Sequence, residues 1–293
     1  GALMECAGIS RRLVAIAENI VGPIPGGLAV STALACVFFG AISGSGPATA
    51  AAIGGIMLPA MIEQRYSRSY SVGIVSGASI IGPIIPPSIP MIMYGVTVGV
   101  SVTKMFTAGF IPGFMLGGGL CLYNYFVSKK RGYRGNTVTM IRKEKINTFK
   151  GAIPAILMPV IVLGGIYGGI FTPTEAAAVS AVYGLFVGVC IYRTLHAKEL
   201  LAVVIDSGRQ AGAIMWNMGN AGLMAWVMTV SGISATITHL LKSVVNGHTL
   251  VFLLIANILV LIAGCFIDGN SIMYIFVPIF MPIATALGVD LYH

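Results

Sequence analysis

The sequence predicts an all-α polytopic membrane protein, and three observations lead to this fold class. The first is composition: of 293 residues, 57% are hydrophobic and only 9% are charged, whereas soluble domains carry about a quarter charged residues. The second is length, because several apolar runs approach the roughly 20 residues with which a helix crosses a bilayer. The third is periodicity, since these runs do not alternate as the strands of a membrane barrel do. We therefore expect a chain that contacts the lipid bilayer on most sides.

Residues 1–27 are expected to form an amphipathic arm helix and a linker. Apolar residues recur with helical spacing over 9–21, and glycines and prolines, which do not continue a helix, fill most of 22–27. The polar side of the predicted helix carries Arg11, Arg12, Glu18 and Asn19.

Segment 28–100 is expected to form a helical hairpin followed by a broken helix. Its two apolar arms, 28–42 and a second one ending at residue 64, are separated by an uncharged turn of small residues. An ordinary loop at the membrane surface is the alternative, but its lack of charge favours a re-entrant tip, buried at membrane depth. The residues of this turn are Ser43, Gly44, Ser45 and Gly46.

The break in the following helix is predicted by the stretch IIGPIIPPSIPM, which starts at residue 80. A single proline would fit a kinked packing helix, but four prolines within eight residues cannot lie in an unbroken one. We take Pro86, Pro87 and Ser88 as its candidate site residues.

The rest of the chain is expected to continue this pattern of spans and polar links. The predicted parts are a span over 101–128, a basic loop over 129–150, connecting spans over 151–230, a second arm helix over 231–248 and a second hairpin over 249–293.

The basic loop predicts the orientation of the chain. Eight of the 17 Lys and Arg residues lie in 129–150, where Glu144 is the only acidic residue. A nucleic-acid or anionic-lipid patch is the alternative interpretation. Because spans are predicted on both sides, the positive-inside rule favours a cytoplasmic loop, and no nucleic-acid partner is expected.

An internal repeat relates the two ends of the chain. GISRRLVAIAENIVG (8–22) and GISATITHLLKSVVNG (232–247) share their opening triplet and apolar spacing, and the same shift places 43–46 over 268–271. Because order and spacing match together, we expect two structural repeats. The second repeat stops before a proline break can follow and the chain begins without an initiator Met, so we expect a fragment of a longer protein.

The interrupted helices predict a binding function. Unpaired backbone groups cost several kcal/mol in hydrocarbon, so irregular backbone occurs only where it is buried in protein or lines a wet cavity. Secondary transporters place ions and substrate at such breaks, between paired repeats. Freed carbonyls with Ser, Thr or Asn oxygens suit Na⁺, and half-helix N-termini suit an anion. We expect Na⁺ near Ser45 and Asn270.

The second turn contributes Asp268, Gly269, Asn270 and Ser271. Asp268 follows a long apolar span, and an intramembrane carboxylate is costly and usually functional. It is also suited to cap the next helix, so ion binding, proton transfer and capping all stay open.

Other polar residues have structural explanations of equal or greater weight. Thr172, Pro173 and Glu175 have the spacing of a capping box. Arg209, Gln210, Asn217 and Asn220 would line a cavity or hydrogen-bond between helices. The five cysteines are scattered, and no Cys/His cluster indicates zinc or a disulfide framework.

Three motifs in order, GAISGSGPATAAAIGGIMLPAM, IIGPIIPPSIPMIMYGV and GGIFTPTEAAAVSAVYG, resemble the large membrane subunit of tripartite ATP-independent periplasmic (TRAP) transporters over essentially the whole chain. The resemblance implies two inverted repeats and elevator-type alternating access, driven by Na⁺, in the bacterial inner membrane. It implies a carboxylate substrate, such as a C4-dicarboxylate, sialic acid or another sugar acid. The implied partners are a small membrane subunit and a periplasmic substrate-binding protein. The polar turn with the proline break, and the second polar turn, would be two halves of the site.

Three other functions are alternatives to this transporter subunit. A stand-alone Na⁺/divalent-anion symporter would need no binding protein, and a channel would need no Na⁺ coupling. A hydrolase using Ser45 and His239 would make the chain an enzyme, which is not expected because no nucleophile elbow or acid supports the pair.

Overall fold

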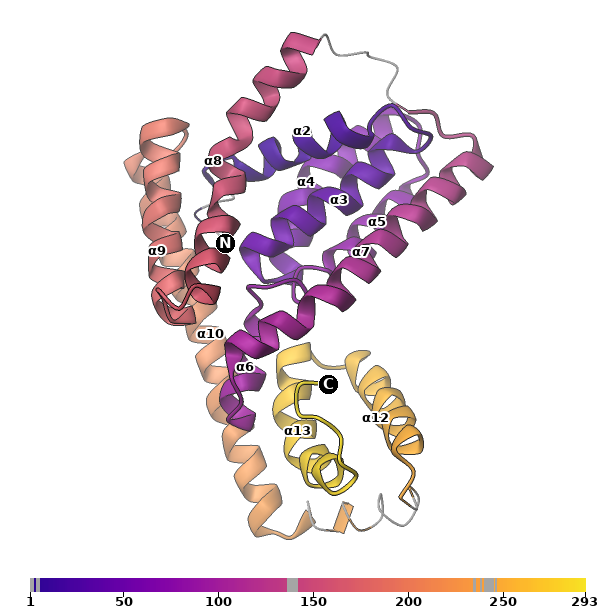
Figure 1. Ribbon diagram of the computed structural model, residues 1–293, viewed down its shortest axis with the longest axis vertical. Helices are drawn as coiled ribbons and strands as arrows, with labels where there is room; N and C mark the ends of the chain where they lie inside the picture. The colour runs from indigo at the N-terminus through magenta and orange to yellow at the C-terminus, as the bar shows by residue number, and fades with distance from the viewer. Residues whose placement is uncertain are drawn as a thin grey trace. The chain divides into compact units, whose positions relative to one another are not determined.

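The computed structural model describes residue 3, residues 6–135, 142–233, 236–237, 239, 245 and 247–293, and the described residues form helices and turns without a strand. The chain divides into two compact units. The first comprises Gly1–Met91 with Phe106–Val204, and the second comprises Ile92–Met105 with Ile205–His293 (Figure 1). Each unit is described by itself.

The helices of the first unit run in the order that the apolar pattern predicts. They are α2 (Ile9–Val21), α3 (Gly27–Ser43), α4 (Gly46–Glu63), α5 (Arg68–Ser79), the start of α6 (Ile89–Val98), most of α7 (Val102–Arg131), α8 (Arg142–Tyr167) and α9 (Pro173–Phe186), which continues into a π-helical turn, Val187–Ile191.

Helix α2 has the predicted bounds and buries one face. Ile9, Leu13, Ile16 and Ala17 are at most 2% exposed, and the helix packs against α3 and α8. Burial of this apolar stripe, rather than helix propensity, stabilises a helix this short.

Helices α3 and α4 form a hairpin that α5 covers (Figure 1). The approach between α3 and the residues after α5 is close: a methyl group built on Gly40 would lie 2.8 Å from the Cα of Gly82. Backbone therefore meets backbone there, and Gly40 leaves no room for a side chain. Gly82 is confined on another side, where a methyl group would lie 2.8 Å from Thr49 Oγ1 and 3.0 Å from Ser45 O.

Three stacked tyrosines tie the end of α7 to the link between α4 and α5. The Tyr133 ring lies 4.2 Å from that of Tyr66 and 5.6 Å from that of Tyr70. The Tyr133 hydroxyl accepts a hydrogen bond from Ser67 N at 3.1 Å, and burial raises the pKa of Tyr66 to about 12. The chain is thus held in place at the start of the predicted basic loop.

That loop is shorter than the expected 129–150, because α7 continues to Arg131 and α8 begins at Arg142. Lysine and arginine are good helix formers, so charge by itself does not end a helix. Residues 136–141 lie outside the described residues.

In the second unit, the remainder of α6 is joined by most of α10 (Ala197–Val230), α12 (Thr249–Gly264) and α13 (Gly269–Ala286). Val245, Phe252 and Ile283 form its small core. Tyr94 donates to the Leu291 carbonyl at 2.7 Å. Half of the predicted second arm, 231–248, lies outside the described residues.

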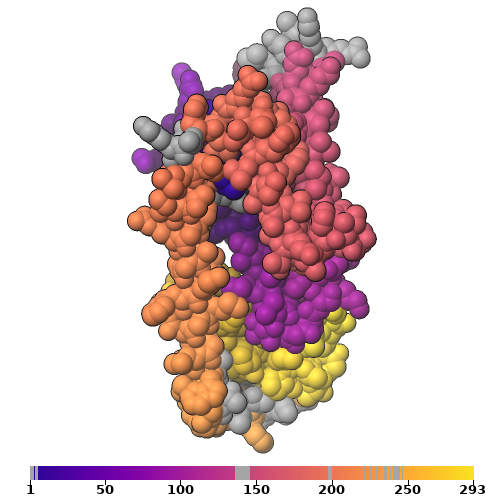
Figure 2. All heavy atoms as spheres, turned by 90° about the vertical axis from the view of Figure 1, so that its left-hand side faces the viewer, coloured from indigo at the N-terminus to yellow at the C-terminus, as the bar shows by residue number. Residues whose placement is uncertain are grey.

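Much of the apolar surface is uncovered, as in a protein whose solvent is lipid. Trp216 and Trp226 of α10 are 74% and 64% exposed, and α10 (orange) stands open on the face in Figure 2. Val102–Arg131, Ile146–Tyr167, Pro173–Ile191 and Gly269–Ala286 are long and apolar enough to cross a bilayer. These findings support a multi-pass membrane protein.

Candidate functional site

The predicted polar turn is the tip of the α3–α4 hairpin. Gly44 ends α3 in the left-handed conformation, with φ +61°, and its N–H donates to Gly40 O at 2.9 Å. Ser45 is the N-cap of α4, and its side chain accepts from Ala48 N at 3.5 Å. Two residues thus separate the last carbonyls of one helix from the first N–H groups of the next.

The hydroxyls of Ser43 and Thr49 form a network with the main chain of Ser45 behind this tip. Thr49 Oγ1 donates to Ser45 O at 2.7 Å and lies 3.0 Å from Ser43 Oγ. Ser45 N donates to Ser43 Oγ at 3.4 Å. Thr49 is fully buried, and Ser43 and Ser45 are partly buried. The tip is therefore rich in neutral oxygen atoms.

The structure brings the predicted proline break against this tip. Helix α5 ends at Ser79 and α6 begins at Ile89, so the four prolines do interrupt the helix; the bond between Pro86 and Pro87 is cis. Ile89 N donates to Gly44 O at 3.3 Å, and a side chain on Gly44 would collide with Pro87 O.

Ser88 connects the proline break to the start of α6 through two hydrogen bonds. Its fully buried hydroxyl donates to Pro83 O and accepts from Met91 N at 3.3 Å. The side chain thus satisfies one of the free donors at the start of α6. Because this break lies against the hairpin tip, the two segments form a single cluster, which we call the first half-site: residues 43–46 and 86–88.

The chemistry of the first half-site favours a hard cation bound by neutral oxygens. The atoms that could bind a cation are hydroxyl and main-chain carbonyl oxygens, and the C-terminal carbonyls of α3 add negative partial charge. No group of three or more His, Cys, Asp or Glu residues gathers anywhere in the part of the chain that the structure describes. Oxygen ligands without charge fit Na⁺ better than they fit a transition metal.

The second predicted turn, in the other unit, lies at the start of α13. The Asp268 carboxylate accepts from Asn270 N at 3.1 Å and from Ser271 N at 3.3 Å, and the Ser271 hydroxyl donates to it as well. The capping role of Asp268 is therefore confirmed. Asn270 Oδ1 is buried and has no hydrogen-bond partner among the described residues, which leaves an oxygen suited to a ligand.

Two further predictions have clear outcomes. Thr172 and Glu175 form both hydrogen bonds of a capping box at the start of α9, so the structural interpretation of Glu175 is confirmed. Arg209, Gln210, Asn217 and Asn220 of α10 are exposed. Two of them bond within their own helix: Gln210 donates to Asp206 at 2.8 Å and Asn220 to Trp216 O at 3.0 Å.

Two residues that support the first half-site, Thr49 and Gly82, were not predicted. Thr49 bonds to the tip from one turn inside α4, and a methyl group on Gly82 would lie 2.8 Å from its hydroxyl oxygen. The spacing Ser45–Thr49 is one helical turn and would have indicated Thr49, had the start of α4 been fixed at Gly46.

Fold and half-site together define a class: a helical membrane protein whose hairpin tip and broken helix form an uncharged, oxygen-lined cluster. Comparison with known proteins identifies the family. The chain belongs to the DctM component family of the tripartite ATP-independent periplasmic transporters, whose model matches residues 1–293.

The relatives are named transporter permeases. Over the whole chain, 41% of residues are identical to the C4-dicarboxylate TRAP transporter large permease protein DctM of Pseudomonas aeruginosa, of which the chain covers 68%. This chain is also 40% identical to the isethionate TRAP transporter permease protein DctMQ of Oleidesulfovibrio alaskensis, of which it covers 46%. The sialic acid TRAP transporter large permease protein SiaM of Vibrio cholerae is 33% identical and is covered to 68%.

Family membership confirms the resemblance drawn from the three motifs. The proteins of this family are transporter subunits and not enzymes, so the alternative of a hydrolase is rejected. The chain spans about half to two thirds of the length of these relatives.

Proposed function

We propose that this chain is part of the membrane subunit of a Na⁺-coupled symporter that imports a small organic anion, in the first instance a carboxylate. The observation that carries the proposal is the first half-site, where an uncharged hairpin tip meets a broken helix. Serine and threonine hydroxyls, together with main-chain carbonyls, would offer a desolvated Na⁺ the oxygen ligands that it needs.

The second turn would supply the other half of the site. Asn270 would contribute a buried oxygen that has no hydrogen-bond partner among the described residues, and Asp268 would contribute a carboxylate one residue before α13. The two hairpins resemble each other in design: the second arm of each has 18 residues, starts at a side-chain cap and contains proline. This likeness supports two structural repeats, and we propose that they are inverted and move as an elevator.

The substrate class follows from the relatives. Those named above carry C4-dicarboxylate, sialic acid and isethionate in their names, and all three are organic anions. The N–H groups at the starts of α4 and α13 would meet the negative charge of such a substrate.

The proposal includes two protein partners. A periplasmic binding protein would deliver the substrate, and a small membrane subunit would pack beside this one. The relative named DctMQ supports the second partner, since its name joins two components in one permease protein. The location proposed is the bacterial inner membrane, with the basic loop in the cytoplasm.

The test is uptake into proteoliposomes that contain the full-length protein and its small subunit. Labelled carboxylates and isethionate are offered with and without an inward Na⁺ gradient, and with and without the binding protein. Uptake that requires both supports the proposal. Uptake with Na⁺ alone would indicate a stand-alone symporter, and uptake that ignores Na⁺ would indicate a channel and contradict the Na⁺ assignment.

A further inference from the structure

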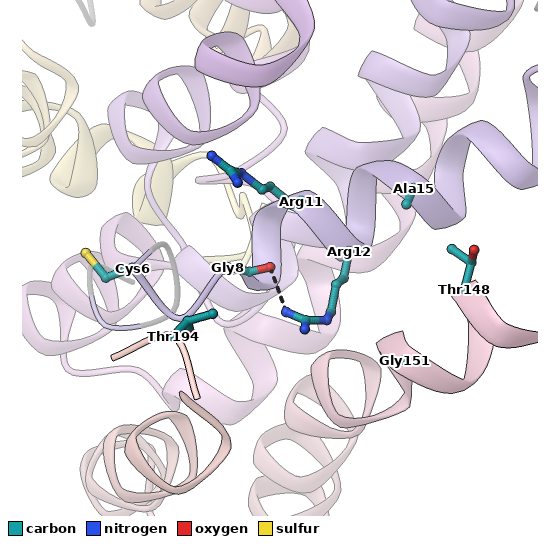
Figure 3. A pocket seen from close by; sticks show the side chains of 8 residues that line it. All are labelled: Cys6, Gly8, Arg11, Arg12, Ala15, Thr148, Gly151 and Thr194. Carbon is teal, nitrogen blue, oxygen red and sulfur yellow. Dashed lines mark hydrogen bonds between the residues drawn. The ribbon is translucent and has the colours of Figure 1, made fainter. Parts of the chain in front are cut away.

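A basic cavity in the first unit lies outside the hairpin and the broken helix. It has a volume of about 650 Å³ and opens where α2, α8 and the residues after the π-helical turn meet (Figure 3). The lining residues are Cys6, Gly8, Arg11, Arg12, Ala15, Thr148, Gly151 and Thr194.

The cavity is built on a fixed frame. Tyr192 donates its hydroxyl proton to Gly151 O of α8 at 3.0 Å, and Thr194 Oγ1 donates to Ala7 O, just before α2, at 3.0 Å. The segment after the π-helical turn therefore ties the start of α2 to α8, and the walls of the cavity hold their separation.

Arg12 is held in this frame. Its guanidinium carbon lies 3.3 Å from the centroid of the Tyr192 ring, and one N–H donates to Gly8 O at 3.4 Å, as Figure 3 shows. Stacking on an aromatic ring fixes the plane of a guanidinium. A guanidinium has five N–H donors, so the bond to Gly8 consumes only part of its capacity.

The charge of the lining has one sign. Of the described residues that line the cavity, two are arginines and none is acidic, and Arg11 is exposed, so its side chain can turn toward a ligand. Guanidinium groups bind phosphate through paired, charge-assisted hydrogen bonds.

The position of the cavity along α8 indicates the depth of the ligand. The helix begins with charged residues at Arg142–Lys150, and its apolar span starts at Ile146. Thr148 and Gly151 line the cavity at this transition, and because a membrane span begins near the bilayer surface, we infer that the cavity opens at the level of lipid headgroups. Basic pockets between helices at that level bind anionic headgroups.

We propose that this cavity binds the phosphate of an anionic ligand, with Arg12 as the fixed contact and Arg11 as the mobile one, and that phosphatidylglycerol in the surrounding leaflet supplies it. This site is separate from the transport site and does not depend on the proposed function. Free inorganic phosphate is the other source of the same chemistry.

The test measures lipid retention by the full-length protein. The protein is equilibrated in phosphatidylcholine nanodiscs with increasing phosphatidylglycerol, extracted, and its bound lipid counted by native mass spectrometry. We compare the wild type with Arg12→Gln, Arg11→Gln and a matched control, Arg134→Gln, which removes the same charge at an exposed position. Removing one guanidinium contact is expected to weaken lipid retention about tenfold.

The proposal holds if phosphatidylglycerol is retained by the wild type and by Arg134→Gln but lost in Arg12→Gln. Should Arg12→Gln fail to fold, the exposed Arg11→Gln serves as the folded variant and must show weakened retention. Competition by millimolar inorganic phosphate at constant ionic strength would assign the site to free phosphate instead of lipid. Equal retention by all four proteins, or equal loss in Arg134→Gln, would overturn the proposal.

Discussion

At Gly44 two independent constraints select the same residue. Its φ of +61° lies in the left-handed region, where a side chain costs roughly 1–2 kcal/mol. A Cβ would also collide with Pro87 O of the proline break. Since that carbonyl belongs to backbone, it cannot move aside as a flexible side chain would.

Replacing Gly44 by Ala is therefore expected to separate the hairpin tip from the break and to reduce Na⁺-driven uptake at least tenfold. Uptake at equal protein level in proteoliposomes measures this. Gly55→Ala is the matched control, because a methyl group there meets nothing within 4 Å and alanine favours the helix. Equal uptake by both variants would show that the contact is dispensable.

Thr49 is expected to act through its hydroxyl. Thr49→Val keeps the shape but removes the donor to Ser45 O and the partner of Ser43, which leaves the buried tip under-bonded at a cost of about 1–3 kcal/mol. We expect a several-fold higher Na⁺ concentration for half-maximal uptake, restored by Thr49→Ser. If the Na⁺ concentration for half-maximal uptake is unchanged in Thr49→Val, the Thr49 hydroxyl does not contribute to Na⁺ binding.

At the scale of elements, helix starts are marked by their caps. Ser45, Asp268 and Thr172 each accept a main-chain N–H at the start of a helix. In two of these cases the cap coincides with a proposed site residue, so a variant there changes both the helix and the chemistry unless the substitution is chosen to separate them.

Asp268→Asn separates the two roles. Asparagine caps a helix as well as aspartate does, but it carries no charge. If the carboxylate binds Na⁺, Asp268→Asn should weaken Na⁺-dependent uptake about as much as Asp268→Ala. Uptake like that of the wild type in Asp268→Asn, with loss only in Asp268→Ala, would assign Asp268 to capping alone.

The capping box of α9 should matter for stability and not for transport. Thr172→Ala removes the side-chain acceptor for Glu175 N and is expected to cost about 1 kcal/mol, while Glu175→Gln keeps both hydrogen bonds of the box. A thermal unfolding scan in detergent should show a lower Tm for Thr172→Ala alone. Loss of uptake in Glu175→Gln would instead indicate that the Glu175 carboxylate takes part in substrate binding.

Elements were predictable where a local signal ends them. The arm α2, the break at the prolines and the hairpin arms follow from glycine, proline and apolar spacing. The end of α7 and the start of α8 were not predictable, because basic residues such as Lys129, Lys130 and Arg131 continue a helix without difficulty. The π-helical turn Val187–Ile191 was not either, because nothing in its apolar sequence separates it from an α-helix.

At the scale of the whole molecule, the class follows from composition because lipid replaces water as the solvent of most side chains. The first half-site was predictable as two segments, since uncharged small residues and clustered prolines interrupt apolar runs. That the two segments belong together was implied only by the family resemblance, because their contact rests on Gly40, Gly44 and Gly82, whose close approach depends on tertiary packing that no spacing in the sequence encodes.

Orientation is the prediction at this scale. A cysteine at the exposed position Arg134 should react with a membrane-impermeant maleimide in inside-out vesicles and not in intact spheroplasts, in a background without the five native cysteines. A cysteine-free parent is the control for background labelling. The reverse pattern would place the basic loop outside and would contradict the positive-inside argument.

The glycine contact between α3 and the segment after α5 has a mechanical consequence. Two backbones that touch without intervening side chains have nothing to repack, so they neither slide nor separate in small steps. We therefore expect Ser43, Gly44 and Ser45 to move as one body with Pro86, Pro87 and Ser88. In the transport cycle proposed above, an ion bound between them would stay with this body, and the movement that exposes it to either side of the membrane would occur elsewhere in the molecule.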